Sequence, residues 1–270
     1  MKNLIIRTLS AVVFCYVVVY SFMHGPELTA GIFLVFAAIG LWEFFNLSDK
    51  SIGVPTYRWI GMATGIVFYV LLARIAILQT DARELIYLLP LPLIGLVHWL
   101  LSKKQTDLSG ITATWFGVVY VILPFISILF LGYAEGEFDY RLPLGVILLT
   151  WVNDTCAYLV GSVIGKNKII ERLSPGKTWE GLIGAVILTL AAAWIIETYM
   201  FGQIESSWYV IAVLASAFST IGDLFESRLK RMAKVKDSGR IMPGHGGALD
   251  RFDGVMFVMP VVYLYMMLVI

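Results

Sequence analysis

The sequence is poor in charged residues and in cysteine, and both shortages narrow the class of protein. Charged side chains make up only 14% of the 270 residues, whereas hydrophobic side chains make up 59%. Soluble domains average about 25% charged and about 45–50% apolar residues, so the composition excludes a soluble globular protein and predicts an integral membrane protein. The two cysteines, Cys15 and Cys156, lie in separate apolar runs. Such positions are typical of small buried hydrophobes rather than of a disulfide or a zinc site.

Other signals are also missing. The formal net charge is only +1, so the overall charge predicts no nucleic-acid partner. The sequence has no convincing internal repeat, no low-complexity segment and no soluble domain. Its apolar start lacks an A-x-A-like cleavage site and is followed by many further apolar runs, so we expect a retained first helix rather than a signal peptide.

The apolar runs predict an all-α, polytopic membrane protein. Because one span needs about 20 mostly apolar residues, the sequence predicts about nine transmembrane helices, with Pro90 and Pro92 interrupting the fourth. The predicted spans cover residues 4–22, 28–46, 59–79, 84–101, 111–133, 143–165, 179–201, 207–225 and 253–270. We interpret residues 1–270 as one membrane-embedded domain, with N-terminal spans in 1–140 and a second part, 141–270, that contains the candidate functional residues.

The basic residues predict the orientation of these spans. Cytosolic loops carry an excess of lysine and arginine, and a cytosolic N-terminus leaves only Arg74, Arg83 and Arg141 on the opposite side. The two large polar loops, 166–178 and 226–252, then lie on the cytosolic face. Because no targeting segment is recognised, we expect a bacterial inner membrane, with the polar loops facing the cytosol and membrane lipids as neighbours.

One polar stretch, residues 227–253, holds a large share of the charge between two apolar segments. Its charged and glycine-rich positions are Lys230, Arg231, Lys234, Lys236, Arg240, Pro243-Gly244-His245-Gly246-Gly247, Asp250, Arg251 and Asp253. Cations, a glycine-rich turn and spaced carboxylates are the groups that hold a polyphosphate and its metal ions. An ordinary basic cytosolic loop would account for the cations, but not for the glycine turn or for aspartates at a membrane boundary.

The spacing of the acidic residues predicts a cation site. Asp223, Glu226, Ser227 and Lys230 lie near one face of a helix. If Asp250 and Asp253 converge with Asp223, the three carboxylates form an all-oxygen site suited to Mg²⁺. An alternative is that Asp250 and Asp253 cap the N-terminus of the last helix.

His245 allows several interpretations. Its ring can serve as a metal ligand, a general base or a phosphate donor. The amides beside it, at Gly244, Gly246 and Gly247, can instead form an anion-binding nest.

A second polar loop precedes the seventh predicted span. Ser174 to Thr178 is similar to the end of a P-loop, but the first glycine is missing at the required spacing, which excludes a Walker nucleotide site. Lys177 can reach a phosphate, or Ser174 can simply begin the next helix. Asp154 lies inside the sixth span, where a carboxylate costs about 2.5–3.5 kcal/mol and marks a functional-site candidate. A neutral hydrogen-bonded pair with Asn153 is the structural alternative.

These residues resemble a known family, the phosphatidate cytidylyltransferases, also called CDP-diacylglycerol synthases. The matching positions of the main motif are Ser227, Lys230, Arg231, Lys236, Asp237, His245, Gly246, Gly247, Asp250, Arg251 and Asp253. The Ser174–Gly181 and Asp154–Tyr158 segments also resemble the family, so the resemblance covers roughly the second half of the chain. Met242 and Ala248 depart mildly from the family pattern, without touching the charged set.

The resemblance implies Mg²⁺-dependent transfer of CMP from CTP to phosphatidate by a homodimer, with a second monovalent or divalent cation as a possible cofactor. It implies metal binding by Asp223, Asp250 and Asp253, and catalytic roles for these three with Lys230, Arg231 and His245. The residues that it assigns to substrate binding are Lys177, Arg172, Ser174, Ser227, Lys236, Asp237, Gly246, Gly247, Arg251 and Asp154.

Two rival interpretations make different predictions from the residues. A transporter with a cytosol-facing ion or anion site would show repeated halves and broken helices at mid-membrane, and neither is evident. A CDP-alcohol phosphotransferase needs an Asp-Gly-x-x-Ala-Arg segment. Asp253-Gly254 begins in the same way but continues Val-Met-Phe, so that match fails.

Overall fold

The structure is a computed structural model that describes residues 2–53, 55–88, 90–101, 108–201, 207–242, 244 and 246–269. Across these residues the chain is helical and has no β-strand, only two isolated bridges, Lys168–Thr178 and Met242–Gly246. The described part contains seven helical segments long and apolar enough to cross a membrane and two shorter apolar helices. The all-α, polytopic membrane fold is therefore confirmed, while the nine-span count and the orientation stay predictions.

The chain divides into two compact units. The first unit contains residues 1–130 and 229–251, and the second contains residues 131–228 and 252–270. The long helix α8, Ser207–Met232, contributes its residues 207–228 to the second unit and its last turn to the first. The polar stretch that begins at Ser227 is thereby grouped mostly with the N-terminal helices.

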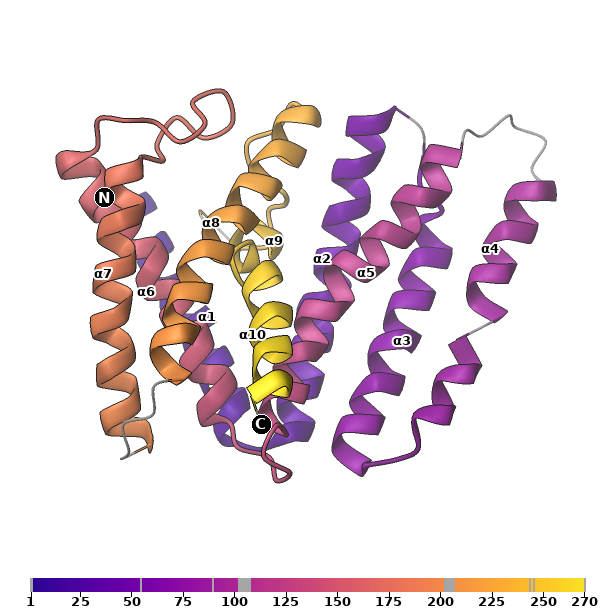
Figure 1. Ribbon diagram of the computed structural model, residues 1–270. Helices are drawn as coiled ribbons and strands as arrows, with labels where there is room; N and C mark the ends of the chain where they lie inside the picture. The colour runs from indigo at the N-terminus through magenta and orange to yellow at the C-terminus, as the bar shows by residue number, and fades with distance from the viewer. Residues whose placement is uncertain are drawn as a thin grey trace. The chain divides into compact units, whose positions relative to one another are not determined.

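The first unit is built on the helices of the N-terminal half. They are α1 (Lys2–Met23), α2 (Pro26–Ile52), α3 (Arg58–Leu78), the 3-10 helix η1 (Ala82–Leu88), α4 (Pro90–Leu101) and α5 (Leu108–Gly132). Helix α2 packs against α1 and α3 (Figure 1). The buried ring of Phe33 on α2 contacts Phe22 of α1 and Phe125 of α5, with ring centroids 5.5 and 6.0 Å apart. Aromatic side chains therefore hold these three helices together.

Proline shapes the fourth predicted span as expected. Helix α4 begins at Pro90, where the missing N–H leaves no hydrogen bond unmade, and the preceding residues 82–88 form the 3-10 helix η1. The predicted span 84–101 is thus a 3-10 segment followed by an α-helix rather than one continuous α-helix.

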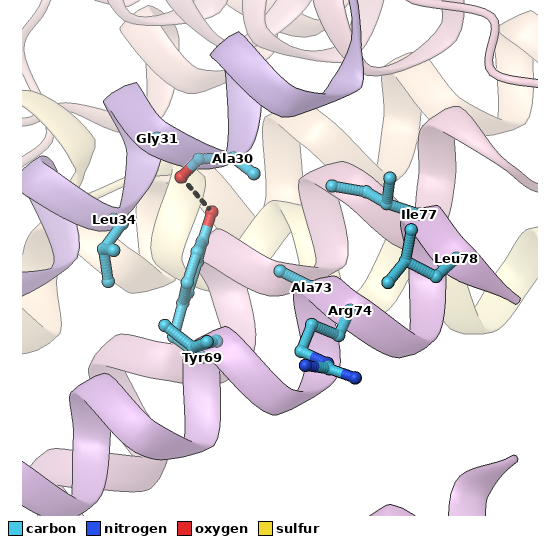
Figure 2. A pocket seen from close by; sticks show the side chains of 9 residues that line it. Ala30, Gly31, Leu34, Tyr69, Ala73, Arg74, Ile77 and Leu78 are labelled. Carbon is cyan, nitrogen blue, oxygen red and sulfur yellow. Dashed lines mark hydrogen bonds between the residues drawn. The ribbon is translucent and has the colours of Figure 1, made fainter. Parts of the chain in front are cut away.

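A small pocket of about 290 Å³ lies between α2 and α3 (Figure 2). Apart from the Tyr69 hydroxyl and Arg74, its walls are apolar side chains. The Tyr69 hydroxyl donates a hydrogen bond to the Ala30 carbonyl at 3.1 Å. Arg74 lies 3.6 Å from the Glu84 carboxylate. No carboxylate lines this pocket among the residues described.

The second unit contains α6 (Arg141–Ile164), α7 (Trp179–Ile196), the π-helix η2 (Glu197–Phe201), most of α8, the last residue of α9 (Leu249–Phe252) and α10 (Val255–Val269). Helices α6 and α7 pack against each other (Figure 1). A side chain at Gly181 would meet the Ala157 carbonyl, so the two helix backbones approach closely there. Helix α10 packs on α6, and its Phe257 contacts Phe225 of α8 with ring centroids 5.5 Å apart.

Candidate functional site

Asp250 is the centre of a hydrogen-bonded network in the first unit. Its Oδ1 accepts a hydrogen bond from the Lys230 ammonium at 2.7 Å, and its Oδ2 accepts three, from the Ser238 amide, the Ser238 hydroxyl and the Gly247 amide, each at 2.8 Å. The side chain is only 6% exposed, and that of Lys230 is 14% exposed. A buried ion pair of this kind is stable only when further hydrogen bonds complete it, and here the loop supplies them.

These partners keep Asp250 ionised. Burial by itself raises the pKa of the carboxyl group, but the adjacent Lys230 ammonium, with the hydrogen bonds from Lys230, Gly247 and Ser238, outweighs burial and lowers the pKa below its ordinary value. Asp250 is therefore a carboxylate near neutral pH, and it holds Lys230 beside it.

A second buried carboxylate, Glu43 of α2, supports the same loop. Its side chain accepts hydrogen bonds from the Ala248 amide at 3.1 Å, from the Leu249 amide at 3.0 Å and from the Ser238 hydroxyl at 3.1 Å. The residue is 4% exposed. Ser238 therefore lies between Glu43 and Asp250, and both carboxylates fix the turn that leads into α9.

The backbone amides of this turn bind carboxylates of the protein itself. The amides of residues 247–249 donate to the side chains of Asp250 and Glu43, and the predicted anion-binding nest around His245 stays a prediction. Gly246 has a φ of +87°, a left-handed conformation that favours glycine. His245 lies outside the described residues, so its predicted catalytic role stays a prediction.

Four of the predicted substrate-binding residues line one cavity of about 530 Å³ in the first unit. They are Lys236, Asp237, Gly246 and Arg251, and two further arginines, Arg7 and Arg240, join them. Arg231, a predicted catalytic residue in the last turn of α8, is exposed and does not line this cavity.

The second unit has its own cavity of about 530 Å³ beside α6, α7 and α8. It brings together the predicted residues Asp154, Ser174, Lys177 and Asp223. The Lys177 ammonium lies 2.6 Å from Asp223 Oδ2, and the Ser227 hydroxyl donates to Asp223 Oδ1 at 3.2 Å. The cavity therefore contains a paired cation and carboxylate.

Asp154 lies in the same cavity with a satisfied side chain. The Ser219 hydroxyl donates to its Oδ1 at 2.5 Å, and Lys177 and Asp223 both act on it electrostatically. Asn153 contributes only a long contact of 3.5 Å to the same oxygen. Asp154 thus joins the Lys177–Asp223 pair, and Ser219 rather than Asn153 is its main partner.

The loop before α7 positions Lys177 through its backbone and through Glu180. The Glu180 carboxylate accepts hydrogen bonds from the Lys166 amide at 3.1 Å and from the Asn167 side chain at 2.6 Å. Thr178 caps α7 by accepting the Gly181 amide at 3.2 Å. The Ile169 amide donates to the Lys177 carbonyl at 3.1 Å. Of the two open interpretations, Ser174 does not cap the helix; Thr178 does, and Lys177 points into the cavity. Arg172 is exposed and does not line it.

The three aspartates predicted to bind a metal are divided between the two units. Within either unit, the described residues bring no three carboxylate, imidazole or thiol side chains together. Asp223 and Asp253 belong to the second unit and Asp250 to the first, so a site of three aspartates stays a prediction. Asp223 and Asp250 each form an ion pair with a lysine ammonium through one oxygen. Each carboxylate therefore already binds a cation, as a metal ligand would. Asp253 Oδ1 accepts the Gly254 amide at 2.9 Å.

Sequence reasoning did not assign Glu43, Ser219, Ser238 or Arg7 to the site, and it named Arg240 only as one of the cations of the polar stretch. A carboxylate inside an apolar span is itself a functional signal, and this signal, applied to Asp154, could also have identified Glu43. The serines and the two arginines carry no comparable signal, because hydroxyl groups and basic termini are common in membrane helices.

Together these features define a polytopic membrane protein whose polar segments place basic side chains and carboxylates around two cavities. The chain belongs to the cytidylyltransferase family, whose sequence profile matches residues 5–269.

Similar proteins span nearly its whole length. A phosphatidate cytidylyltransferase of Staphylococcus saprophyticus is 32% identical over 258 residues, which cover 94% of this chain and 96% of that protein. Proteins of the same name from Staphylococcus epidermidis and Staphylococcus aureus are 30% and 33% identical, with the same coverage. The family resemblance seen in the second half of the sequence therefore extends through the first half.

Proposed function

We propose that this protein is a phosphatidate cytidylyltransferase, which transfers CMP from CTP to phosphatidate and releases pyrophosphate. A phosphate oxygen of phosphatidate attacks the α-phosphorus of CTP. The bond from that phosphorus to the bridging oxygen breaks, and CDP-diacylglycerol remains in the membrane. The family and the name shared by its relatives support this reaction, and neither is that of a transporter.

The observation that carries the proposal is the cavity of the second unit. It combines the cations Lys168 and Lys177 with apolar walls that include Leu182, Ile169 and Ala157. A lipid phosphate needs both, a cation for its headgroup and an apolar surface for its chains. Lys177 would bind the phosphate of phosphatidate, and the Glu180-supported loop would hold Lys177 in place.

The Asp250 network would serve the nucleotide. The nucleophile is an ionised phosphate, so little base catalysis is needed, and positioning with charge neutralisation dominates. Asp250, Ser238 and Gly247 fix Lys230 in one orientation. A preorganised ammonium of this kind stabilises charge that develops on the leaving pyrophosphate.

We propose Mg²⁺ as the cofactor, with Asp223, Asp250 and Asp253 as candidate ligands. When bound, the ion would neutralise negative charge on the triphosphate. Asp250 Oδ2 already has three donors, so a metal at Asp250 would share Oδ1 with the Lys230 ammonium. We also propose a cytosol-facing active site in a bacterial inner membrane and a homodimeric assembly.

The test is transfer of radiolabel from CTP to phosphatidate in detergent micelles, with Mg²⁺ present and then chelated. We expect a labelled lipid that forms only with the metal. Absence of labelled lipid from monodisperse protein, across several phosphatidate species, would contradict the proposed reaction. Label that forms equally after chelation would contradict the metal alone.

A further inference from the structure

The cavity of the first unit gathers basic side chains from segments far apart in the chain. Arg7 comes from α1, Lys236 and Arg240 from the loop after α8, and Arg251 from α9. The cavity has a volume of about 530 Å³, and Asp237 is the one acidic residue that lines it among the residues described. Four cations therefore face one carboxylate, in a chain whose formal net charge is only +1.

Within the described residues, these cations lack carboxylate partners, unlike the two lysines that lie beside the predicted aspartates. Lys177 and Lys230 each form an ion pair shorter than 3 Å. In the part of the chain that the structure describes, Arg7, Lys236, Arg240 and Arg251 form none. Like charges in one concave site repel one another, and a bound anion removes that repulsion.

Arg251 adds a second observation that points to a ligand. Its Nε is buried and has no hydrogen-bond acceptor within the described residues. A buried donor without a partner costs free energy, and the great majority of such groups are satisfied. An acceptor brought by a ligand would satisfy this one.

The backbone shape keeps the cavity open beside Arg7. Gly244 has a φ of +78°, and a side chain there would run into the aliphatic part of Arg7. Arg7 therefore lies close above the loop that carries Lys236 and Arg240, although it is more than 200 residues away in the sequence.

The lining selects among phosphate ligands. Met242 is the one large apolar side chain that contributes to it among the described residues, so acyl chains of a lipid have little surface to lie on. Guanidinium groups pair with phosphate oxygens in a two-pronged geometry, and three arginines can together hold several phosphate groups.

We propose that Arg7 and Arg240 complete the polyphosphate site predicted around Lys236 and Arg251, contact the β- and γ-phosphates of the nucleotide and the pyrophosphate product, and determine the specificity of the cavity for a polyphosphate. The inference rests on the proposed function, which supplies the nucleotide. It extends that function by recruiting α1, which lies outside the recognisable motif, to the nucleotide site.

The experiment measures pyrophosphate binding to the full-length protein in detergent by calorimetry, without added divalent cation. For Arg7→Ala we expect the Kd for pyrophosphate to rise on the order of 10-fold or more, because charge-assisted hydrogen bonds are lost. Arg7→Lys should give a smaller rise in Kd, since lysine keeps the charge but lacks the planar guanidinium that binds phosphate through two N–H groups. The matched control is Arg83→Ala, which removes an arginine whose side chain is 92% exposed and should leave the Kd unchanged.

A second arm separates the polyphosphate from a lipid headgroup. In the transfer assay, Arg7→Ala should raise the KM for CTP and the inhibition constant of pyrophosphate, and leave the KM for phosphatidate unchanged. A raised KM for phosphatidate alone would assign the cavity to the lipid headgroup and overturn the proposal, as would an unchanged pyrophosphate Kd. Arg7-dependent pyrophosphate binding by a protein that transfers no CMP would support this cavity and contradict the proposed reaction instead.

Discussion

The cavity of the first unit and the cavity of the second unit have the same volume, about 530 Å³ each, but differ in whether their cations are paired with carboxylates. In the second unit Lys177 is paired with Asp223, and apolar side chains form part of the wall. In the first unit Arg7 and Arg240 face a polar cavity without carboxylate partners among the described residues. A cavity that balances its own charge suits a ligand with one phosphate and a large apolar part. A cavity with unbalanced cations suits a ligand that brings several negative charges.

The largest effect is expected from replacement of Asp250, the carboxylate that binds Lys230 and the loop before α9. Asp250→Asn removes the charge that holds Lys230 at 2.7 Å, and we expect kcat for CMP transfer to fall by on the order of 100-fold or more. The measurement is the radiolabel assay on protein that elutes as a single species. Asp81→Asn, in the exposed turn before η1, is the matched control, and transfer by Asp250→Asn at the control's rate would remove Asp250 from the site.

Replacement of Lys177 tests whether the second cavity serves the lipid. Lys177→Met keeps the length of the side chain and removes its ammonium. We expect kcat/KM for phosphatidate to fall by about 10- to 100-fold, with the KM for CTP nearly unchanged. If the KM for CTP rises instead, both cavities act on the nucleotide, and the contrast between them fails.

Replacement of Glu43 tests whether α2 positions the nucleotide loop. Glu43→Gln keeps the shape but places an amide donor where the carboxylate accepts three hydrogen bonds. We expect the free energy of unfolding to fall by about 1–3 kcal/mol and kcat to fall about 10-fold with little change in the KM for phosphatidate.

Two further variants separate the positioning role of Glu43 from its contribution to stability. Glu43→Asp keeps the charge and should recover part of kcat. Ser48→Ala, one of the buried polar positions of the same helix, should change stability alone. Equal losses of kcat in Glu43→Gln and Ser48→Ala would show that α2 matters for folding only.

The smallest effect is a pH dependence of stability. The pKa of Asp250 is lowered in the folded protein, so its ionised form contributes stability that is present above the unfolded value of about 3.9 and is lost as pH falls through the folded value. We expect the difference in Tm between the wild type and Asp250→Asn to stay constant from about pH 5 to 8 and to narrow below about pH 4. A difference that narrows between pH 5 and 8 would show that Asp250 is not held ionised by Lys230.

The sequence predicts the helices and both polar segments well, because charge in an apolar background is costly and therefore conspicuous. It predicts Lys177, Asp154 and Asp223 as site residues, and the structure places them around one cavity. It does not predict their pairing, because the Lys177–Asp223 contact depends on how the loop before α7 folds on Glu180 and Thr178.

The contribution of the N-terminal half to the site could not be predicted from the sequence for a different reason. The contacts of Glu43 lie 195 to 206 residues away, and no periodicity or motif records contacts at such separation. The role of Arg7 could not be predicted either, because basic residues are common at any cytosolic end of a membrane helix.

The hydrogen bonds of Glu43 also bear on how this chain can change over evolutionary time. One buried hydrogen-bonded set contains the carboxylate at position 43, the hydroxyl at position 238 and the backbone amides of residues 248 and 249. A change at one member removes hydrogen bonds from the others, so we expect positions 43 and 238 to be inherited as a pair. The half of the chain that has no recognisable motif would then diverge more slowly at this position than its neighbours on α2.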